Sequence, residues 1–293
     1  MRTLITGGAG FIGSSLSGTH RIVKREPNLL NYIETERYFV KNNFENILHC
    51  AANISSAQIM KKNHHTYLIE NLQIDLNVLE ASRVTKVDNL LIIGSISGLK
   101  PNSEGVIDEG CLSEGPSTSI NYGYNFEKFI QPYLVETYQK DFGLNYKSVL
   151  LSNCYGPGAL IKDDAPLVSS LISQILRAKS LDINLNLYGT GEDLRNLTYV
   201  GDLDLVLKQH MINSKNTDPI IVASPYILKI REIVEIITNL LKFSNKIEFT
   251  EYDSNSTRNN KICSNNKLMS LGYEVKWTSP EEGLRITIER LGI

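Results

Sequence analysis

The chain has 293 residues, of which 42% are hydrophobic and 21% charged, and its 30 Lys and Arg nearly balance its 32 Asp and Glu. This length supplies a large core, and the balance of charge argues against a protein that binds nucleic acid or an anionic membrane. Apolar runs are short or interrupted by charges, without a signal-peptide segment, so we expect a cytoplasmic protein with a small-molecule partner.

Strand and helix patterns alternate along the first half of the chain. Residues 2–6 form an apolar run that predicts a strand, and the glycine-rich segment 7–13 predicts a turn that enters a helix. Further strands are expected at 20–23, 46–51, 89–94 and 146–151, and helices at 33–41, 66–83 and 124–141. This alternation predicts an α/β fold with a doubly wound parallel sheet, the Rossmann architecture.

The alternation loosens after residue 155. A helix at 167–178, strands at 197–200 and 220–222, and helical segments near the C-terminus are expected there. We therefore expect a smaller C-terminal substrate-binding lobe. The predicted dinucleotide-binding domain comprises residues 1–155 with 195–223 returning to it, and the predicted lobe comprises 156–194 and 224–293.

The glycine turn predicts a dinucleotide site. Gly7 permits the tight turn, Gly10 lets a pyrophosphate approach the backbone, and Gly13 lets the helix pack on the strand. Phosphates would lie at the helix N-terminus, against Gly10, Phe11, Ile12 and Gly13. Glycines at this spacing also occur in ordinary tight turns, so the position directly after an N-terminal strand carries the inference.

The end of the second strand bears on the choice of cofactor. Lys24 and Arg25 stand where an acidic residue would select NAD, and a guanidinium can bind a 2′-phosphate bidentately. This pair favours NADP, with NAD left possible and a solvated basic turn as the alternative interpretation. Since only residues 14–19 separate Gly13 from His20, the first helix must be shortened by about two turns.

A second group of residues points to acid-base chemistry. Tyr124 and Lys128 lie four residues apart in an expected helix, where the ammonium would favour the phenolate form of the tyrosine. Ser95 directly follows a buried strand. It is a better candidate than Ser97 for the hydroxyl that, together with Tyr124, would bond the carbonyl of a substrate. Seen alone, Tyr124 would be interpreted as an ordinary buried aromatic residue, and Ser95 and Ser97 as loop-capping serines. The four scattered cysteines lack a Cys-x-x-Cys pair, so no metal site is expected.

Together these motifs resemble the extended short-chain dehydrogenase/reductase family over almost the whole chain. The motifs are residues 6–13, 50–52, 95, 124 with 128, 153–157 and 195–202. The resemblance implies that Tyr124 is the proton donor, that Ser95 orients the carbonyl and that Lys128 also binds the nicotinamide ribose. It further implies that Ala51, Ala52 and Asn71 line the cofactor groove.

Within that family, residues 91–157 are most similar to the GDP-L-fucose synthase branch. This likeness implies a nucleotide-diphosphate sugar as substrate, and it assigns substrate binding to Ser97, Asn153, Arg195 and Arg258. The two arginines suit a diphosphate, which takes charge-assisted hydrogen bonds, although Arg258 is equally consistent with a surface ion pair. We also expect a homodimer.

The chain departs from that branch at its epimerising residues. The branch uses a Cys and a His to move protons at carbons 3 and 5, but Ser97 aligns with the Cys and the His position falls near Pro166. A serine hydroxyl is too weak an acid for this task near neutral pH. The acidic pair of the 4,6-dehydratases is also missing after Ser95.

The expected activity is therefore NADPH-dependent reduction of the 4-keto group of a nucleotide-linked 4-keto-6-deoxy sugar, without 3,5-epimerisation. An NAD-dependent nucleotide-sugar 4-epimerase is the first alternative, because it would use the same Ser95, Tyr124 and Lys128. A non-catalytic dinucleotide-sensing protein is the second, although such proteins usually lack the Tyr and Lys pair.

Overall fold

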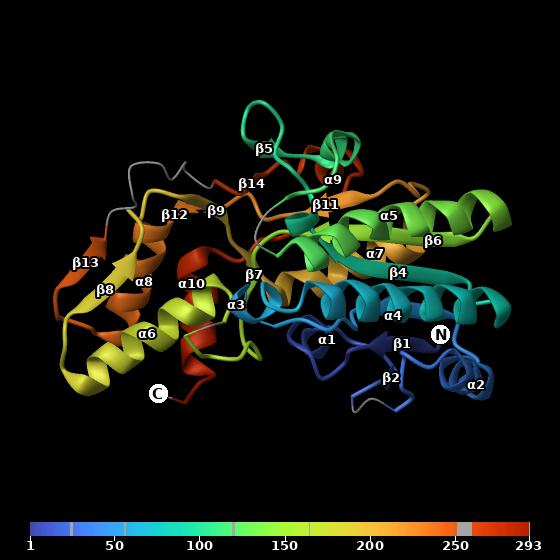
Figure 1. The fold of residues 1–293 in the computed structure, drawn as a ribbon, viewed down its shortest axis with the longest axis horizontal. Helices are drawn as coiled ribbons and strands as arrows, with labels where there is room; N and C mark the ends of the chain where they lie inside the picture. Colours follow the sequence, from blue (N-terminus) through green and yellow to red (C-terminus); the bar gives the residue numbers. More distant parts are fainter. Residues whose placement is uncertain (24–25, 56, 119–120, 164, 251–259, 293) are drawn as a thin grey trace.

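The computed structural model describes residues 1–23, 26–55, 57–118, 121–163, 165–250 and 260–292. Its centre is a six-stranded parallel sheet in the order β11-β6-β4-β3-β1-β2 (Figure 1). The strands are β1 (Thr3–Thr6), β2 (His20–Arg21), β3 (Asn46–His49), β4 (Asn89–Ser95), β6 (Asn145–Leu151) and β11 (Ile220–Val222). In β4, Leu90, Leu91 and Ile92 are fully buried, as expected where helices cover both faces of a parallel sheet.

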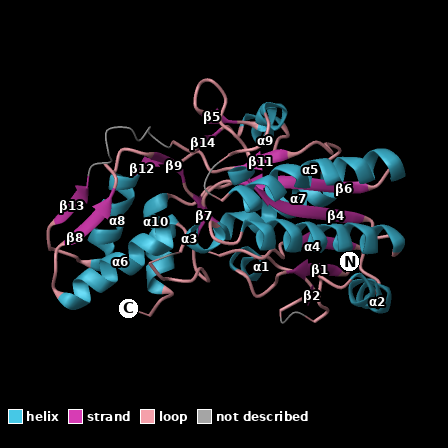
Figure 2. Ribbon diagram, in the orientation of Figure 1, coloured by secondary structure: helices cyan, strands magenta, loops and turns pink. Residues whose placement is uncertain are grey.

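Helices cover both faces of this sheet (Figure 2). One face packs against α2 (Tyr32–Asn42), α4 (His64–Val84) and α5 (Tyr122–Phe142). The opposite face packs against α1 (Phe11–Ser15), α7 (Leu203–Asn213) and α9 (Asn266–Ser270). The predicted doubly wound architecture is therefore confirmed.

A smaller lobe with its own core lies at the left of Figure 1. It contains α6 (Leu167–Leu181), α8 (Ile230–Leu241), α10 (Pro280–Glu289) and the parallel pair β8 (Leu185–Tyr188) and β13 (Ile247–Thr250). Short strand pairs join the lobe and the sheet domain along the chain. They are β7 (Cys154–Tyr155) with β10 (Thr198–Tyr199), β9 (Leu194–Asn196) with β12 (Ile227–Lys229), and β5 (Val106–Ile107) with β14 (Ile262–Cys263).

The remaining elements are short helical segments. They are α3 (Ala57–Met60) and the 3-10 segments η1 (Ile96–Gly98), η2 (Glu109–Glu114) and η3 (Val200–Asp202). The expected strands and helices are present within a few residues of their predicted ends, except that the strands expected at 20–23 and 197–200 shrink to two residues each. Among the described helices, none is long and apolar enough to cross a bilayer.

The order of the strands fixes where a ligand can bind. Strand β1 lies between β2 and β3, so the chain leaves β1 toward one side of the sheet and later returns on the other. At such a switch point the loops after neighbouring strands diverge, and a crevice opens at the carboxyl ends of the strands. The segments that follow β1, β3, β4 and β6 all lie at this edge.

Candidate active site

A cavity of about 620 Å³ opens at the switch point of the sheet. Its wall includes the predicted cofactor residues Gly7, Gly10, Phe11, Ile12, Gly13, Ala51 and Ala52. Gly7 has φ +63°, and a β-carbon there would lie 2.8 Å from Cα and N of Ala51. Only glycine allows the turn after β1 to approach the end of β3 this closely, which leaves room for a dinucleotide along the backbone.

The three predicted catalytic residues lie on the same cavity wall. Ser95 ends β4, and Tyr124 and Lys128 come from the first turns of α5. The Lys128 ammonium lies 5.7 Å from the centroid of the Tyr124 ring. The structure thus brings together side chains that are 29 and 33 residues apart in sequence.

Gly98 allows α5 to lie this close to Ser95. A β-carbon at Gly98 would lie 2.6 Å from the backbone nitrogen of Phe129 and 2.8 Å from the carbonyl oxygen of Asn125. No other residue would leave space for the helix backbone at that point, so the turn η1 and α5 pack directly on each other. The Ser95 hydroxyl accepts the Ser97 amide at 3.2 Å, which keeps η1 in place.

The pKa of Tyr124 reflects several competing influences. Burial raises it most, and the nearby charges of Glu127 and Asp75 raise it further. The charge of Lys128 and the interaction with the Ser95 side chain lower it, but the pKa stays above the ordinary value. A phenol with a raised pKa is fully protonated near neutral pH, so the tyrosine can give a proton to a bound substrate.

The far end of the cavity lies between the sheet and the smaller lobe. Asn153 lines it, and the amide nitrogen of this residue is buried without a hydrogen-bond partner. A buried donor without a partner is costly, and a polar ligand would satisfy it. Pro166, Leu167 and Val168 contribute an apolar part of the lining. No histidine is among the described residues that line the cavity.

Other predicted site residues lie off the cavity wall or outside the described residues. Asn71 is buried and bonds both backbone groups of Asn53, which itself lines the cavity. Ser97 is half-buried, and its hydroxyl has no hydrogen-bond partner. Arg195 bonds the carbonyl of Leu194 at 2.8 Å. Lys24, Arg25 and Arg258 lie outside the described residues, and their assigned roles stay predictions.

The shortened first helix has a compensating contact. Helix α1 has only five residues, as the short crossover predicted. The guanidinium of Arg21 donates to the carbonyl of Gly13 at 2.6 Å and to the carbonyl of Leu16. These carbonyls belong to the end of α1, where no further helical turn exists to satisfy them.

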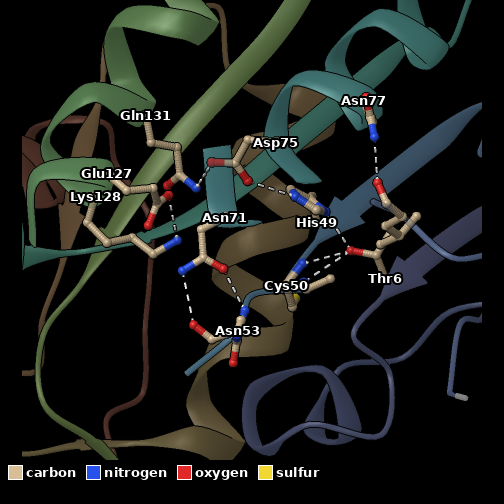
Figure 3. A network of polar contacts seen from close by, with 12 residues as sticks. Thr6, His49, Cys50, Asn53, Asn71, Asp75, Asn77, Glu127, Lys128 and Gln131 are labelled. Atoms are coloured by element: carbon tan, nitrogen blue, oxygen red, sulfur yellow. Dashed lines mark hydrogen bonds and ion pairs between the residues drawn. The ribbon is translucent and has the colours of Figure 1, made fainter. Parts of the chain in front are cut away.

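A network of polar side chains behind the cavity was not predicted (Figure 3). It joins Thr6, His49, Asp75 and Gln131 through hydrogen bonds, and it also contains Glu127 beside Lys128. A signal was present in the sequence. Tyr124, Glu127, Lys128 and Gln131 recur at the spacing of one helix face, and polar residues repeated on a buried face indicate a functional cluster.

Comparisons with known proteins agree with this description. A model of the NAD dependent epimerase/dehydratase family matches residues 3–216. A GDP-L-fucose synthase from Sinorhizobium fredii is 26% identical over 298 residues, which cover 98% of this chain and 94% of the relative.

Two solved structures extend the likeness to the fold. A GDP-L-fucose synthetase from Naegleria fowleri bound to NADP has a TM-score of 0.89 at 20% identity, with 99% of this chain and 92% of that chain covered. A GDP-mannoheptose C4 reductase from Campylobacter jejuni with NADP bound has a TM-score of 0.86 at 21% identity, with 100% and 98% covered.

Proposed function

Because the chain belongs to the NAD dependent epimerase/dehydratase family, we propose that it is an NADPH-dependent reductase of nucleotide-linked 4-keto-6-deoxy sugars that does not epimerise carbons 3 and 5. The observation that carries the proposal is the placement of Ser95, Tyr124 and Lys128 on one cavity wall beside the glycine turn. The names of the relatives, a GDP-L-fucose synthase and a GDP-mannoheptose C4 reductase, support a nucleotide-sugar substrate.

The residues present fit a dinucleotide cofactor. The turn at Gly7 would hold a pyrophosphate through its backbone groups, and Lys128, which also lines the cavity, would bond the hydroxyls of the nicotinamide ribose. NADPH, when bound, supplies the hydride for carbon 4. The preference for NADP over NAD rests on Arg25 and on the NADP-bound relatives.

The chain's own residues supply the rest of the reaction. Tyr124 would donate its proton to the oxygen on carbon 4, which completes the conversion of the ketone to a secondary alcohol. The hydroxyl of Ser95 donates a hydrogen bond to the same oxygen, where negative charge develops in the transition state. Lys128 stabilises the phenolate that remains on Tyr124.

Further residues bear on substrate binding and on the proposed absence of epimerisation. Asn153 offers its unpartnered amide nitrogen to the sugar or the nucleotide, and Arg195 and Arg258 are proposed to bind the diphosphate. The wall at Pro166 to Val168 supplies no acid or base for carbons 3 and 5. Cys50 also lines the cavity, but burial raises its pKa to about 12, so this thiol stays protonated.

The direct test is a screen of GDP-, dTDP-, UDP- and CDP-linked 4-keto-6-deoxy sugars for NADPH consumption. At least one sugar should be reduced by the parent and not by the Tyr124→Phe variant. If no sugar consumes NADPH faster with the parent than with the variant, the proposal is wrong. A purified protein that retains NAD and interconverts C4 epimers without net reduction would establish the 4-epimerase alternative instead.

A further inference from the structure

The catalytic lysine belongs to a buried polar cluster that the proposed reaction does not use in full (Figure 3). We define this cluster as His49, Asp75, Glu127, Lys128 and Gln131. The exposed fractions of these residues are at most 3%. Two carboxyl groups and one ammonium are thus buried near Tyr124. Removal of charged groups from water costs free energy, so a buried cluster of this kind calls for an explanation.

Asp75 is the ionised carboxylate of the cluster. Its Oδ1 lies 3.0 Å from Nε2 of His49, and its Oδ2 accepts the side-chain amide of Gln131 at 2.9 Å. Burial opposes ionisation of Asp75, but the hydrogen bond with His49 and the charge of Lys128 outweigh it and lower the pKa. This carboxylate therefore carries its negative charge at neutral pH.

The hydrogen bonds of Thr6 indicate which ring nitrogen of His49 accepts a hydrogen bond. The Thr6 hydroxyl oxygen accepts the amides of Cys50 and Ala51, each at 3.2 Å, and lies 2.6 Å from Nδ1 of His49. With two donors already directed at its oxygen, the hydroxyl donates its own proton to Nδ1. The histidine proton is then on Nε2 and points at Asp75.

Glu127 is different from Asp75. Its Oε1 lies 3.1 Å from Nζ of Lys128, whereas its Oε2 is buried without a hydrogen-bond partner. Burial raises the pKa of Glu127 to about 8, since the effect of Lys128 is too weak to offset burial and the charge of Asp75. Near neutral pH the cluster thus holds one carboxylate, one ammonium and one protonated carboxyl.

The two carboxyl groups and the lysine have opposite effects on the pKa of Tyr124. The positive charge of Lys128 favours the phenolate, while negative charge on Asp75 and Glu127 favours the neutral phenol. As the pH rises, Glu127 loses its proton before Tyr124 does. The carboxylate that forms places a negative charge beside the phenol, and this charge opposes ionisation of the phenol. The phenol therefore keeps its proton to a higher pH than lysine alone would allow.

We propose that Glu127 is a positioning residue that, together with Asp75, keeps Tyr124 protonated, so that the site favours proton donation to a carbonyl over proton abstraction from an alcohol. The proposal deepens the reductase function and rests on it. An enzyme that must oxidise and re-reduce carbon 4 needs the phenolate as well as the phenol. The cluster favours the neutral phenol of Tyr124, which is the form that the reductive step requires.

The groups that act on Tyr124 come from several elements packed around it. Glu127 and Lys128 lie on its own helix α5, Asp75 on α4 and Ser95 at the end of β4. Tyr67 of α4 and Met60 of α3 pack with the Tyr124 side chain. The thiol of Cys50 stays protonated. Above the pKa of Glu127, removal of its charge therefore changes the electrostatics at Tyr124, and among the described groups that act on Tyr124 the remaining charges are those of Asp75 and Lys128.

A titration of the tyrosine tests the proposal without any substrate. The protein is labelled with tyrosine carrying ¹³C at Cζ, and the Tyr124 signal is assigned by its loss in Tyr124→Phe. In the parent, this signal should shift with a midpoint near pH 8, the pKa of Glu127, before the tyrosine itself ionises at higher pH. In Glu127→Gln the step near pH 8 should vanish, and Tyr124 should ionise about one pH unit lower.

A matched control separates this effect from the general loss of a buried carboxyl. Glu109 is also a carboxyl with a pKa raised by burial, but it accepts the amide of Ile221. Glu109→Gln should leave both Tyr124 transitions unchanged. A parent signal without a step near pH 8, or a Tyr124 midpoint that stays unchanged in Glu127→Gln, would overturn the proposal.

Kinetics link the titration to catalysis. For a reducible 4-keto sugar, kcat/KM of Glu127→Gln should fall on the alkaline side about one pH unit earlier than in the parent, with the KM for NADPH within a few fold. A raised KM at an unchanged pH profile would instead indicate that Glu127 only places Lys128. If no sugar is reduced while the tyrosine titration behaves as expected, the proposed reductase activity fails and the effect of Glu127 on Tyr124 stands.

Discussion

The hydroxyl oxygen of Ser95 accepts a hydrogen bond from the backbone amide of Ser97 at 3.2 Å. This contact occupies one lone pair of Ser95, whose hydroxyl also makes a side-chain hydrogen bond with Tyr124 at the cavity. The hydroxyl of Ser97 is buried, has no hydrogen-bond partner and does not line the cavity. Two serines in one turn are therefore in chemically different positions.

Substitution of each serine should show this difference. Ser95→Ala should lower kcat for reduction by about 10²–10³-fold, the usual cost of one hydrogen bond to a developing oxyanion. Ser97→Ala should keep kcat within a few fold, because the buried hydroxyl makes no bond that the reaction needs. Steady-state kinetics of both variants under the same conditions check the prediction. An equal loss in both would mean that the turn η1 matters only for its shape.

Loss of the phenol should remove catalysis without removing binding. Tyr124→Phe should lower kcat by about 10²–10⁴-fold, since the proton donor acts mainly in the transition state, while the affinity for the nucleotide sugar stays within a few fold. Tyr122→Phe is the control, because Tyr122 lies on the same helix and is 47% exposed. Calorimetry and single-turnover rates measure the two effects separately. If Tyr124→Phe were as active as the parent, Tyr124 would not be the proton donor.

The sequence predicted those parts of the site that depend on local geometry. The turn at Gly7 depends only on the strand before it, and the spacing of Tyr124 and Lys128 depends only on one helix. The structure contains this strand and this helix where the sequence predicted them. The hydrogen bond between Asp75 and Gln131 was not predicted, because it depends on how α4 and α5 pack together. A spacing rule within one helix carries no information about the residue that faces it from another helix.

The cofactor preference should depend on the basic pair after β2. The parent should bind NADPH more tightly than NADH, and Arg25→Ala should reduce the difference by about 10-fold or more, because charge-assisted bonds to a phosphate are lost. The exposed Arg37 of α2 supplies the control variant Arg37→Ala, which should keep the preference. Calorimetric titration with both cofactors provides the measurement. Equal affinities in the parent would refute the prediction.

Incubation in heavy water tests the absence of epimerisation. A 4-keto sugar kept with the enzyme but without NADPH should gain no deuterium at carbons 3 and 5 beyond an enzyme-free control, because Ser97 and Pro166 supply no acid-base pair. Addition of NADPH should give one product that differs only at carbon 4. Enzyme-dependent labelling at either carbon, read by NMR, would show that another residue moves these protons.

Arg21 should be more important for stability than a surface arginine with a similar bond. Arg21→Leu leaves the carbonyls of Gly13 and Leu16 without their donor, so the free energy of unfolding should fall by about 1–3 kcal/mol. Arg2 bonds the carbonyl of Asn42 at the surface, and Arg2→Ala should cost less than about 1 kcal/mol because water can replace it. Urea unfolding of both variants measures the difference.

The same arginine limits how this chain can change over evolutionary time. A longer first helix would supply its own donors to the carbonyls at its present end, but it would also occupy the space that the Arg21 side chain fills. An insertion after Ser15 is therefore tolerable only together with replacement of Arg21, and either change alone is harmful. Homologues with a full-length helix should accordingly carry a different residue at this position, and intermediates between the two forms should be rare.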